Sequence, residues 1–148
     1  MKEAKDLISG YWEVFGTAKK FFDNIVQEAI KTMSLRSLYD GRVYWIENKD
    51  PDNPADQASI RNAAMNYPMQ SGNASITKIA MTRIRNKFRG TDAKIILQIH
   101  DELVSELPAE GADVLFAVQK QEMIAAGEEL VKNVPIKVEG ELDIKWSK

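Results

Sequence analysis

The sequence predicts an α+β fold in which a small antiparallel sheet packs against long amphipathic helices. Three observations support this class. Apolar residues recur at helical spacing over residues 2 to 33 and again from about residue 69 to 88. Residues 95 to 107, IILQIHDELVSEL, read as two apolar strands around a polar tip. Residues 136 to 146, IKVEGELDIKW, alternate apolar and charged side chains, which is typical of a half-buried antiparallel strand.

The composition fits a globular protein that can bury a sizeable core, with 148 residues, 44% of them hydrophobic and 28% charged. No apolar run approaches the roughly 18 residues that a membrane span needs, and the N-terminus lacks a signal-peptide core. We therefore expect a cytoplasmic protein without a membrane partner. The absence of cysteine excludes disulfides and thiolate metal sites. With a net charge of only −2, any contact with nucleic acid requires a local basic patch.

The first part of the chain is predicted to hold two helices and a hairpin. Gly16 predicts a break in the first helical stretch, with Thr17 capping a second helix. Asp40-Gly41 between aromatic flanks is a strong hairpin signal. The polar, Pro-containing loop at residues 48 to 56 is the predicted boundary, which divides the chain into residues 1–56 and 57–148.

The second part is predicted to begin with a helix over residues 57 to 66, which Pro68 interrupts before the long helix from about 69 to 88. The stretch from residue 57 to 91 contains no Asp or Glu. A cluster of this kind is either a solvated helix face or a patch for phosphates. Its basic residues are Arg61, Lys78, Arg83, Arg85, Lys87 and Arg89. A further amphipathic helix is expected over residues 109 to 133.

The tip of the second hairpin, His100-Asp101-Glu102, lacks the usual turn residues and carries two adjacent carboxylates. Adjacent carboxylates repel each other, and a hard divalent cation relieves that repulsion. Mg²⁺ is usually held by one or two carboxylates together with substrate phosphates. The tip is therefore either a solvated acidic turn or half of a magnesium site for phosphoryl chemistry.

Several stretches together resemble the family A, DNA polymerase I-like, DNA polymerases. LQIHDELVSELP, at the second hairpin, resembles the family's motif C. AAMNYPMQSGNASITKIAM, residues 63 to 81, is similar to its Asn-x-Pro-x-Gln stretch and the palm helix that follows. SLYDGRVYW resembles its Gly-Arg hairpin, and VPIKVEGELDIKW its last strand with a terminal Trp. Order and spacing agree from about residue 3 to Trp146.

The resemblance implies a role for individual residues. Asp101 corresponds to the catalytic, metal-binding aspartate, and Glu102 to the neighbouring acid, which contributes less directly. His100 corresponds to a residue near the primer terminus. Asn66 and Gln70 correspond to side chains that contact the DNA minor groove, where amides can donate to acceptors that every base pair offers. On sequence alone, the two amides could instead cap a loop before a helix.

The sequence departs from the family at an arginine expected four residues before Asn66, where Asn62 stands. Arg61 is the nearest arginine, so its contact with DNA requires a helix irregularity that restores the register. The resemblance further implies that residues 1–56 derive from the fingers region and residues 57–148 form the C-terminal palm.

Two motifs of the family are not matched. Motif A supplies a second aspartate, and motif B a helix that binds the incoming nucleotide; nothing before residue 60 matches either. A two-metal mechanism needs ligands on both sides of the reacting phosphate. We therefore expect a DNA-directed DNA polymerase that is inactive alone and uses Mg²⁺, nucleotide and primer-template DNA only with a second chain carrying motifs A and B.

Other readings stay open. The chain could be an inactive remnant, or a stand-alone DNA-binding or interaction module that uses the basic helix. A split polymerase gene can arise in a phage-like genome, so a phage protein in a bacterial host is one expected source. A strand or helix face that lacks its usual neighbour exposes apolar surface, which predicts a homodimer when the chain is isolated.

Overall fold

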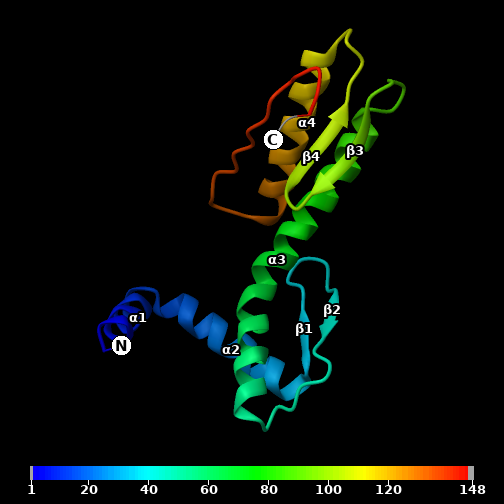
Figure 1. The fold of residues 1–148 in the computed structure, drawn as a ribbon. Coiled ribbons are helices and arrows are strands. Elements are labelled where there is room, and N and C mark those ends of the chain that lie inside the picture. The colour runs from blue at the N-terminus through cyan, green and yellow to red at the C-terminus, as the bar shows by residue number, and fades with distance from the viewer. Residues whose placement is uncertain (1, 147–148) are drawn as a thin grey trace. The chain divides into compact units, whose positions relative to one another are not determined.

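The protein has an α+β fold, and the computed structural model describes residues 2–146 of it (Figure 1). The predicted class is confirmed: long helices accompany small antiparallel sheets, here two separate sheets of two strands each. None of the helices in the described range is long and apolar enough to cross a lipid bilayer. In chain order the elements are α1 (Lys2–Val14), α2 (Gly16–Thr32), β1 (Ser34–Arg36), β2 (Val43–Trp45), α3 (Pro54–Lys87), β3 (Lys94–Ile99), β4 (Glu102–Glu106) and α4 (Ala112–Leu130).

Contacts along the chain divide the molecule into two compact units, Met1–Gln70 and Ser71–Lys148. The division lies within α3, whereas the sequence places its boundary in the polar loop at residues 48 to 56. That loop leads directly into the first turn of α3. The derivation of residues 1–56 from the fingers and of residues 57–148 from the palm stays a prediction.

The two N-terminal helices are present as predicted, but they meet at Phe15. The Phe15 carbonyl accepts a hydrogen bond from the Lys19 N–H, so it forms the first turn of α2, which begins at Gly16. Thr17 therefore lies inside the helix, and the prediction that it caps α2 is wrong. The helix start has no side-chain cap.

The first hairpin, β1–β2, forms around Asp40-Gly41 as predicted. Its turn uses the chemistry that these residues offer: the Asp40 carboxylate accepts a hydrogen bond from the Arg42 N–H at 3.2 Å. Gly41 has a φ of 69°, a left-handed conformation that glycine adopts without steric cost. Leu35 of β1 is buried and anchors the hairpin. The buried core of this unit consists of Val26, Ala29, Leu35, Ile60 and Ala64.

Helix α3 runs through Pro68 as a single helix of 34 residues, so the prediction that Pro68 interrupts it is wrong. Proline lacks the N–H that would bond to the carbonyl four residues earlier, which costs roughly 3 kcal/mol in a helix interior. Apolar side chains on each side of it are buried: Ile60 and Ala64 before it, and Ala80 and Ile84 after it. Burying one large apolar side chain contributes about 1.5–3 kcal/mol, so packing outweighs the lost bond.

The second hairpin, β3–β4, packs against α3 and α4 through Leu103 of β4, which is 7% exposed. The Gln119 Nε2 of α4 donates a hydrogen bond to the Leu103 carbonyl at 3.0 Å. This bond ties the backbone of β4 to the helix. The buried core of the second unit consists of Ala80, Ile84, Phe88, Ala93, Leu103 and Ala126.

A β-bulge at Ile96 changes which residues of β3 face the helices. Ile95 pairs with Ser105 and Leu97 pairs with Val104, so Ile96 is the extra residue. Without the bulge, Ile95 and Leu97 would share a face, because side chains alternate along a strand. With it, Ile95 packs against the core, whereas Leu97 is 41% exposed.

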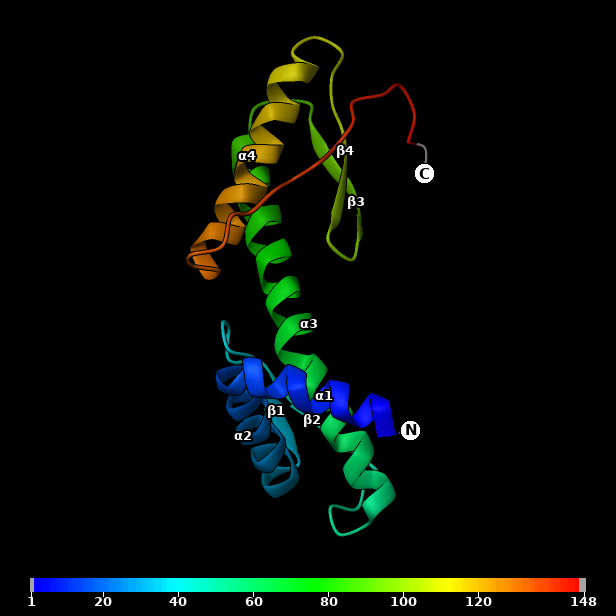
Figure 2. The ribbon, with the colours of Figure 1, turned by 90° about the vertical axis from the view of Figure 1, so that its left-hand side faces the viewer.

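The segment after α4 is irregular, so the predicted strand over residues 136 to 146 is wrong. It crosses α4, as Figure 2 shows, and forms no ladder with a strand of the described chain. Its first part contacts α4, since Ile136 packs on Gly127 and Gly140 lies against Phe116, whereas Leu142 and Ile144 are 44% and 100% exposed. A Cβ atom at Gly127 would lie 2.9 Å from Ile136 Cγ2, so a larger residue there would force Ile136 to shift.

Candidate functional site

The tip of the second hairpin is a tight connection made by His100 and Asp101, because Ile99 pairs with Glu102. His100 has a φ of 52°, a left-handed conformation that non-glycine residues seldom adopt. Two-residue hairpin connections require such a φ, and glycine or asparagine usually supplies it. Holding histidine there costs of order 1–3 kcal/mol, and strain of this kind clusters at functional sites. The Gln98 Nε2 supports the turn by donating to the His100 carbonyl at 3.0 Å.

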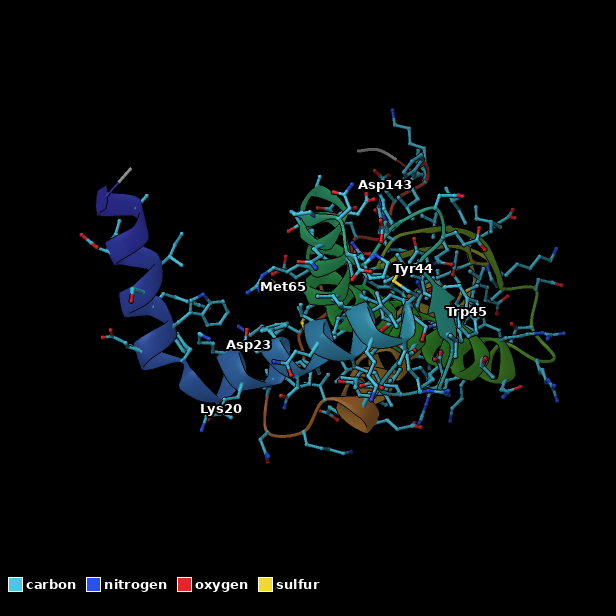
Figure 3. The ribbon with its side chains drawn as sticks, turned by 90° about the horizontal axis from the view of Figure 1, so that it is seen from below. Lys20, Asp23, Tyr44, Trp45, Met65 and Asp143 are labelled. Carbon is cyan, nitrogen blue, oxygen red and sulfur yellow. The ribbon has the colours of Figure 1, made fainter. Side chains whose placement is uncertain are left out.

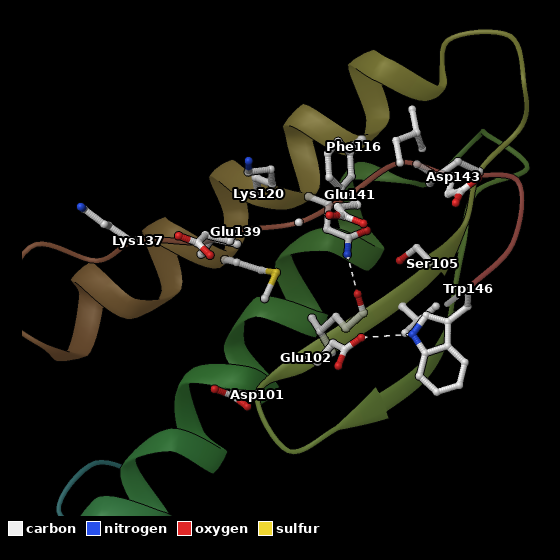
Figure 4. A pocket seen from close by; sticks show the side chains of 18 of the residues that line it. Asp101, Glu102, Ser105, Phe116, Lys120, Lys137, Glu139, Glu141, Asp143 and Trp146 are labelled. Carbon is white, nitrogen blue, oxygen red and sulfur yellow. Dashed lines mark hydrogen bonds between the residues drawn. The ribbon is translucent and has the colours of Figure 1, made fainter. Parts of the chain in front are cut away.

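Asp101 and Glu102 project from this turn as neighbouring carboxylates, and both are exposed. The Glu102 Oε1 accepts a hydrogen bond from the Trp146 Nε1 at 3.2 Å, drawn as a dashed line in Figure 4. Asp101 has no hydrogen bond or ion pair with the rest of the described chain. One acid of the pair is therefore held in place by the protein, and the other is free to take a ligand.

The two carboxylates fit one side of a site for a hard divalent cation. Carboxylate oxygens are the ligands that Mg²⁺ prefers, and one or two of them suffice when phosphates complete the shell. Within residues 2–146, no group of three or more His, Cys, Asp or Glu side chains lies close enough to hold a metal ion. The remaining ligands would therefore have to come from substrate or from another part of a larger assembly.

A cavity of about 460 Å³ lies beside the carboxylates, between β4, α4 and the C-terminal segment (Figure 4). Ser105 Oγ and Gln119 Oε1 both line it and are buried without a hydrogen-bond partner among the described atoms. Buried oxygens of this kind usually bind ordered water. Sequence patterns do not find this wall, because Gln119 interrupts the apolar face of its helix and the C-terminal segment reads as a strand.

The predicted minor-groove residues, Asn66 and Gln70, are both exposed on α3. Four residues separate them, which places them on one face of a helix. Asn62 lies one further turn back on the same face and is also exposed. The structure thus supports the reading of these amides as a helix surface and not as a loop cap.

Arg61 lies off this face and has an acidic neighbour. Its Nη2 is 3.7 Å from the Asp23 Oδ1 of α2, an aspartate labelled in Figure 3. A hydrogen bond from Lys19 is the main cause that lowers the pKa of Asp23 below its usual value, and the charge of Arg61 adds to it. The helix irregularity that would return Arg61 to the Asn66 face is not present, since α3 is continuous there. Its contact with DNA stays a prediction.

The other basic residues of α3 fall into two groups. Arg83 pairs with Glu122 and Glu129 of α4, and Lys87 lies 3.6 Å from Glu122. The hydrogen bond to Glu129 is the main cause that raises the pKa of Arg83. Lys78, Arg85 and Arg89 are exposed and have no ion pair with another described residue.

Two of the unpaired cations line a second cavity. It measures about 570 Å³, lies between the end of α3 and the start of β3, and has Arg85, Arg89 and Lys94 in its wall. No acidic side chain lines it. Coulomb attraction therefore favours an anionic ligand there over a cationic one.

The structure brings together the three tip residues that the sequence predicts, His100, Asp101 and Glu102, at one turn of the second unit. Asn66 and Gln70 lie on a helix face of the first unit. The contact of Trp146 with Glu102 is not predicted by any local pattern, because 44 residues separate the two.

Comparison with known proteins gives one family. The family model described as DNA polymerase family A matches residues 1–148. DNA polymerase I of Caldicellulosiruptor bescii is 33% identical over 147 residues, which cover 98% of this chain and 17% of that protein. DNA polymerase I of Treponema pallidum is 32% identical over 148 residues, which cover 98% of this chain and 14% of that protein. The chain thus spans less than a fifth of the length of these relatives.

Among solved structures, the chain is similar to the POL domain of Pol1 from M. smegmatis in complex with a DNA primer-template and dNTP. The TM-score is 0.74 at 28% sequence identity, and the match covers 84% of this chain and 22% of that one.

Proposed function

This chain belongs to the family A DNA polymerases, and from that premise we propose that it supplies one side of a two-metal nucleotidyl-transfer site. Asp101 holds a catalytic Mg²⁺, and Glu102 assists. When bound, the cation stabilises charge that develops on the reacting phosphate. The chain acts as the C-terminal palm of a DNA-directed DNA polymerase whose motifs A and B are carried by a second chain.

The observation that carries this proposal is the pair of carboxylates on a strained two-residue turn, with no third metal ligand in the described part of the chain. Packing of Leu103 and the hydrogen bond from Gln119 hold the strand that bears them. A pair of oxygen ligands on an anchored hairpin, with the remaining coordination positions open, suits a metal that substrate phosphates complete.

Contacts with primer-template DNA are proposed for two surfaces. Asn66 and Gln70 present side-chain amides from one helix face, and amide N–H groups can donate to minor-groove acceptors that all base pairs share. His100 lies beside Asp101 at the turn. We propose that it contacts the primer end. Arg61 adds a positive charge close to the amides only if its ion pair with Asp23 opens.

Uncovered apolar surface supports the need for a second chain. Ile96 and Leu97 on β3 are 58% and 41% exposed, and the outer edge of β3 has no partner strand among the described residues. Such an edge invites pairing with another chain. Helix α1 is likewise exposed on its apolar side, at Leu7, Ile8, Tyr11 and Val14. In isolation the same surfaces would drive a homodimer.

The decisive experiment is reconstitution. The purified chain, given Mg²⁺, nucleotides and primer-template, should show no extension, because its metal site is one-sided. Co-expression with a chain that carries motifs A and B should restore extension, and sedimentation should show a complex of the two in place of self-association. Robust extension by the 148-residue chain alone would overturn the proposal.

The stand-alone DNA-binding module is the second candidate, favoured by the unpaired cations of α3. Its test is the salt dependence of DNA binding, since each neutralised phosphate contributes a slope of about −0.9 to log K against log salt. Arg85→Gln or Arg89→Gln should each reduce the slope by about one such unit, whereas the ion-paired Arg83→Gln should leave it unchanged. Sequence-specific binding that persists at high salt would favour the module over the polymerase part.

A further inference from the structure

Among the residues that the structure describes, one hydrogen bond orients the Glu102 carboxylate, and it comes from the Trp146 indole. The Nε1–H of the indole donates to Oε1 at 3.2 Å (Figure 4). The other oxygen, Oε2, accepts no hydrogen bond from the described residues. Glutamate has several rotatable bonds, so an unheld side chain at an exposed turn would sample many positions.

Trp146 is not held there by burial, because 52% of its surface is exposed. The segment that carries it is fixed further back, where Ile136 packs on Gly127 and Gly140 lies against Phe116. These two contacts guide an irregular segment across α4 (Figure 2). An exposed indole at the end of such a segment is explained by its hydrogen bond more readily than by packing.

The neighbouring carboxylate is treated differently. Asp101 has no hydrogen bond or ion pair within the described chain, and its shorter side chain is limited by the turn itself. The longer side chain of Glu102 is the one that needs an external restraint. The position of Asp101 is therefore set by the backbone of the turn, whereas that of Glu102 is set by the hydrogen bond from Trp146.

We propose that Trp146 is a positioning residue for Glu102: its indole N–H occupies Oε1 and leaves Oε2 directed to the cation. The proposal rests on the metal-binding function proposed above for the same site. Donors that orient a metal ligand are common, and their loss typically lowers metal affinity by about 10- to 100-fold. Since Glu102 is the lesser ligand, the expected loss of affinity for Trp146→Phe is at or below the low end of that range, about 3- to 10-fold.

The first test needs no metal. In the full-length chain, the ¹H–¹⁵N resonance of the Trp146 indole should move when Glu102→Ala removes its acceptor. The indole resonances of Trp12 and Trp45 serve as internal references and should stay in place. A Trp146 resonance that does not respond to Glu102→Ala would overturn the proposal, because the hydrogen bond would then be absent in solution.

The second test measures Mn²⁺ binding to the chain by paramagnetic broadening of the resonances at the hairpin tip. Trp146→Phe keeps the ring and removes the donor, and it should weaken binding by about 3- to 10-fold. Trp45→Phe is the matched control, since Trp45 is 64% exposed and its indole has no hydrogen-bond partner among the described residues. It should leave the affinity unchanged. Double substitution of Glu102→Ala and Trp146→Phe should cost no more than Glu102→Ala alone.

Two failures can be told apart. If Asp101→Ala and Glu102→Ala weaken Mn²⁺ binding but Trp146→Phe does not, the positioning role is overturned and the metal site stands. If neither acid affects Mn²⁺ binding, the metal site and the positioning role both fall. Thermal unfolding of each variant verifies that the chain is folded, and Trp146→Tyr, which also lacks the indole donor, should repeat the result of Trp146→Phe.

Discussion

Both hairpins of this protein have a left-handed residue in the turn, but the residue differs between them. The β1–β2 hairpin turns at Asp40-Gly41, where glycine adopts a φ of 69° and the aspartate caps the turn through a hydrogen bond from the Arg42 N–H. The β3–β4 hairpin turns at His100 and Asp101, and the histidine has a φ of 52° without glycine's freedom. The first turn is stabilised locally by its own sequence, whereas the second is imposed on its sequence by the strands.

The surroundings of the two hairpins explain how each turn persists. All three residues of β2 are exposed, including Tyr44 and Trp45, which Figure 3 labels on that strand. That hairpin depends on its turn chemistry, on Leu35 and on Tyr67 of α3, whose hydroxyl donates to the Arg42 carbonyl at 3.2 Å. The second hairpin is anchored by Leu103 and by Gln119 of α4, so it can hold an unfavourable turn. The difference teaches that stability from packing frees a tip to carry reactive side chains.

The largest expected effect is on the rate of nucleotide addition, and it distinguishes Asp101 of the second hairpin from Asp40 of the first. In a reconstituted polymerase, Asp101→Ala should lower the rate of nucleotide addition at saturating substrate at least about a hundredfold, the scale on which removal of one electrostatic group acts. Glu102→Ala should cost less. Asp40→Ala, at the other tip, should leave the rate unchanged. Single-turnover primer extension measures all three, and a near-normal rate for Asp101→Ala would show that this turn is not catalytic.

The next effect concerns the anchor of the second hairpin. Leu103→Ala should lower the free energy of unfolding by about 2–3 kcal/mol, because it leaves a cavity in a packed core. Leu97→Ala, on the exposed face of the same hairpin, should change it by less than about 0.5 kcal/mol. Urea unfolding followed by circular dichroism gives both values. Equal costs at the two positions would mean that the hairpin is not held by its inner face.

The smallest effect tests the turns themselves. His100→Gly should raise the free energy of unfolding by up to about 1 kcal/mol, because relief of the left-handed strain outweighs the entropy that glycine adds to the unfolded chain. Gly41→Ala should lower it by about 1 kcal/mol, since alanine must adopt glycine's φ of 69°. Changes of opposite sign in the free energy of unfolding, measured with urea, would confirm that the two turns differ. A decrease for His100→Gly would show that histidine is not strained there.

The sequence predicts those parts of this protein that depend on local patterns. Asp40-Gly41 predicts the turn of the first hairpin, and the apolar runs around His100 predict the strands of the second. The pair of carboxylates is also found by reading, because Asp101 and Glu102 are adjacent in the chain. A resemblance to a known family adds the expected role of each, but the geometry at the tip had to come from the structure.

The elements that the sequence predicts wrongly are those whose structure depends on contacts between residues far apart in the chain. Pro68 reads as a helix break, yet buried residues on both sides keep α3 continuous. The alternation of residues 136 to 146 is typical of a half-buried strand, but Leu142 and Ile144 on its apolar side are exposed and no strand forms. A strand also requires a neighbouring backbone, and here Gly127 offers a helix surface in its place. The same long-range contacts bring Trp146 to Glu102.

The bulge at Ile96 affects which strands of a partner protein can pair with the outer edge of β3. A strand that adds to the outer edge of β3 finds straight backbone only on either side of the extra residue, so a regular partner cannot stay in register along the whole edge. Stacking of identical chains into fibrils needs long, flat, matching edges and is therefore disfavoured. A partner whose strand bends at the same place would bind without that mismatch. The bulge thus disfavours aggregation through the apolar edge of β3. It still allows pairing with a partner strand that has a matching bend.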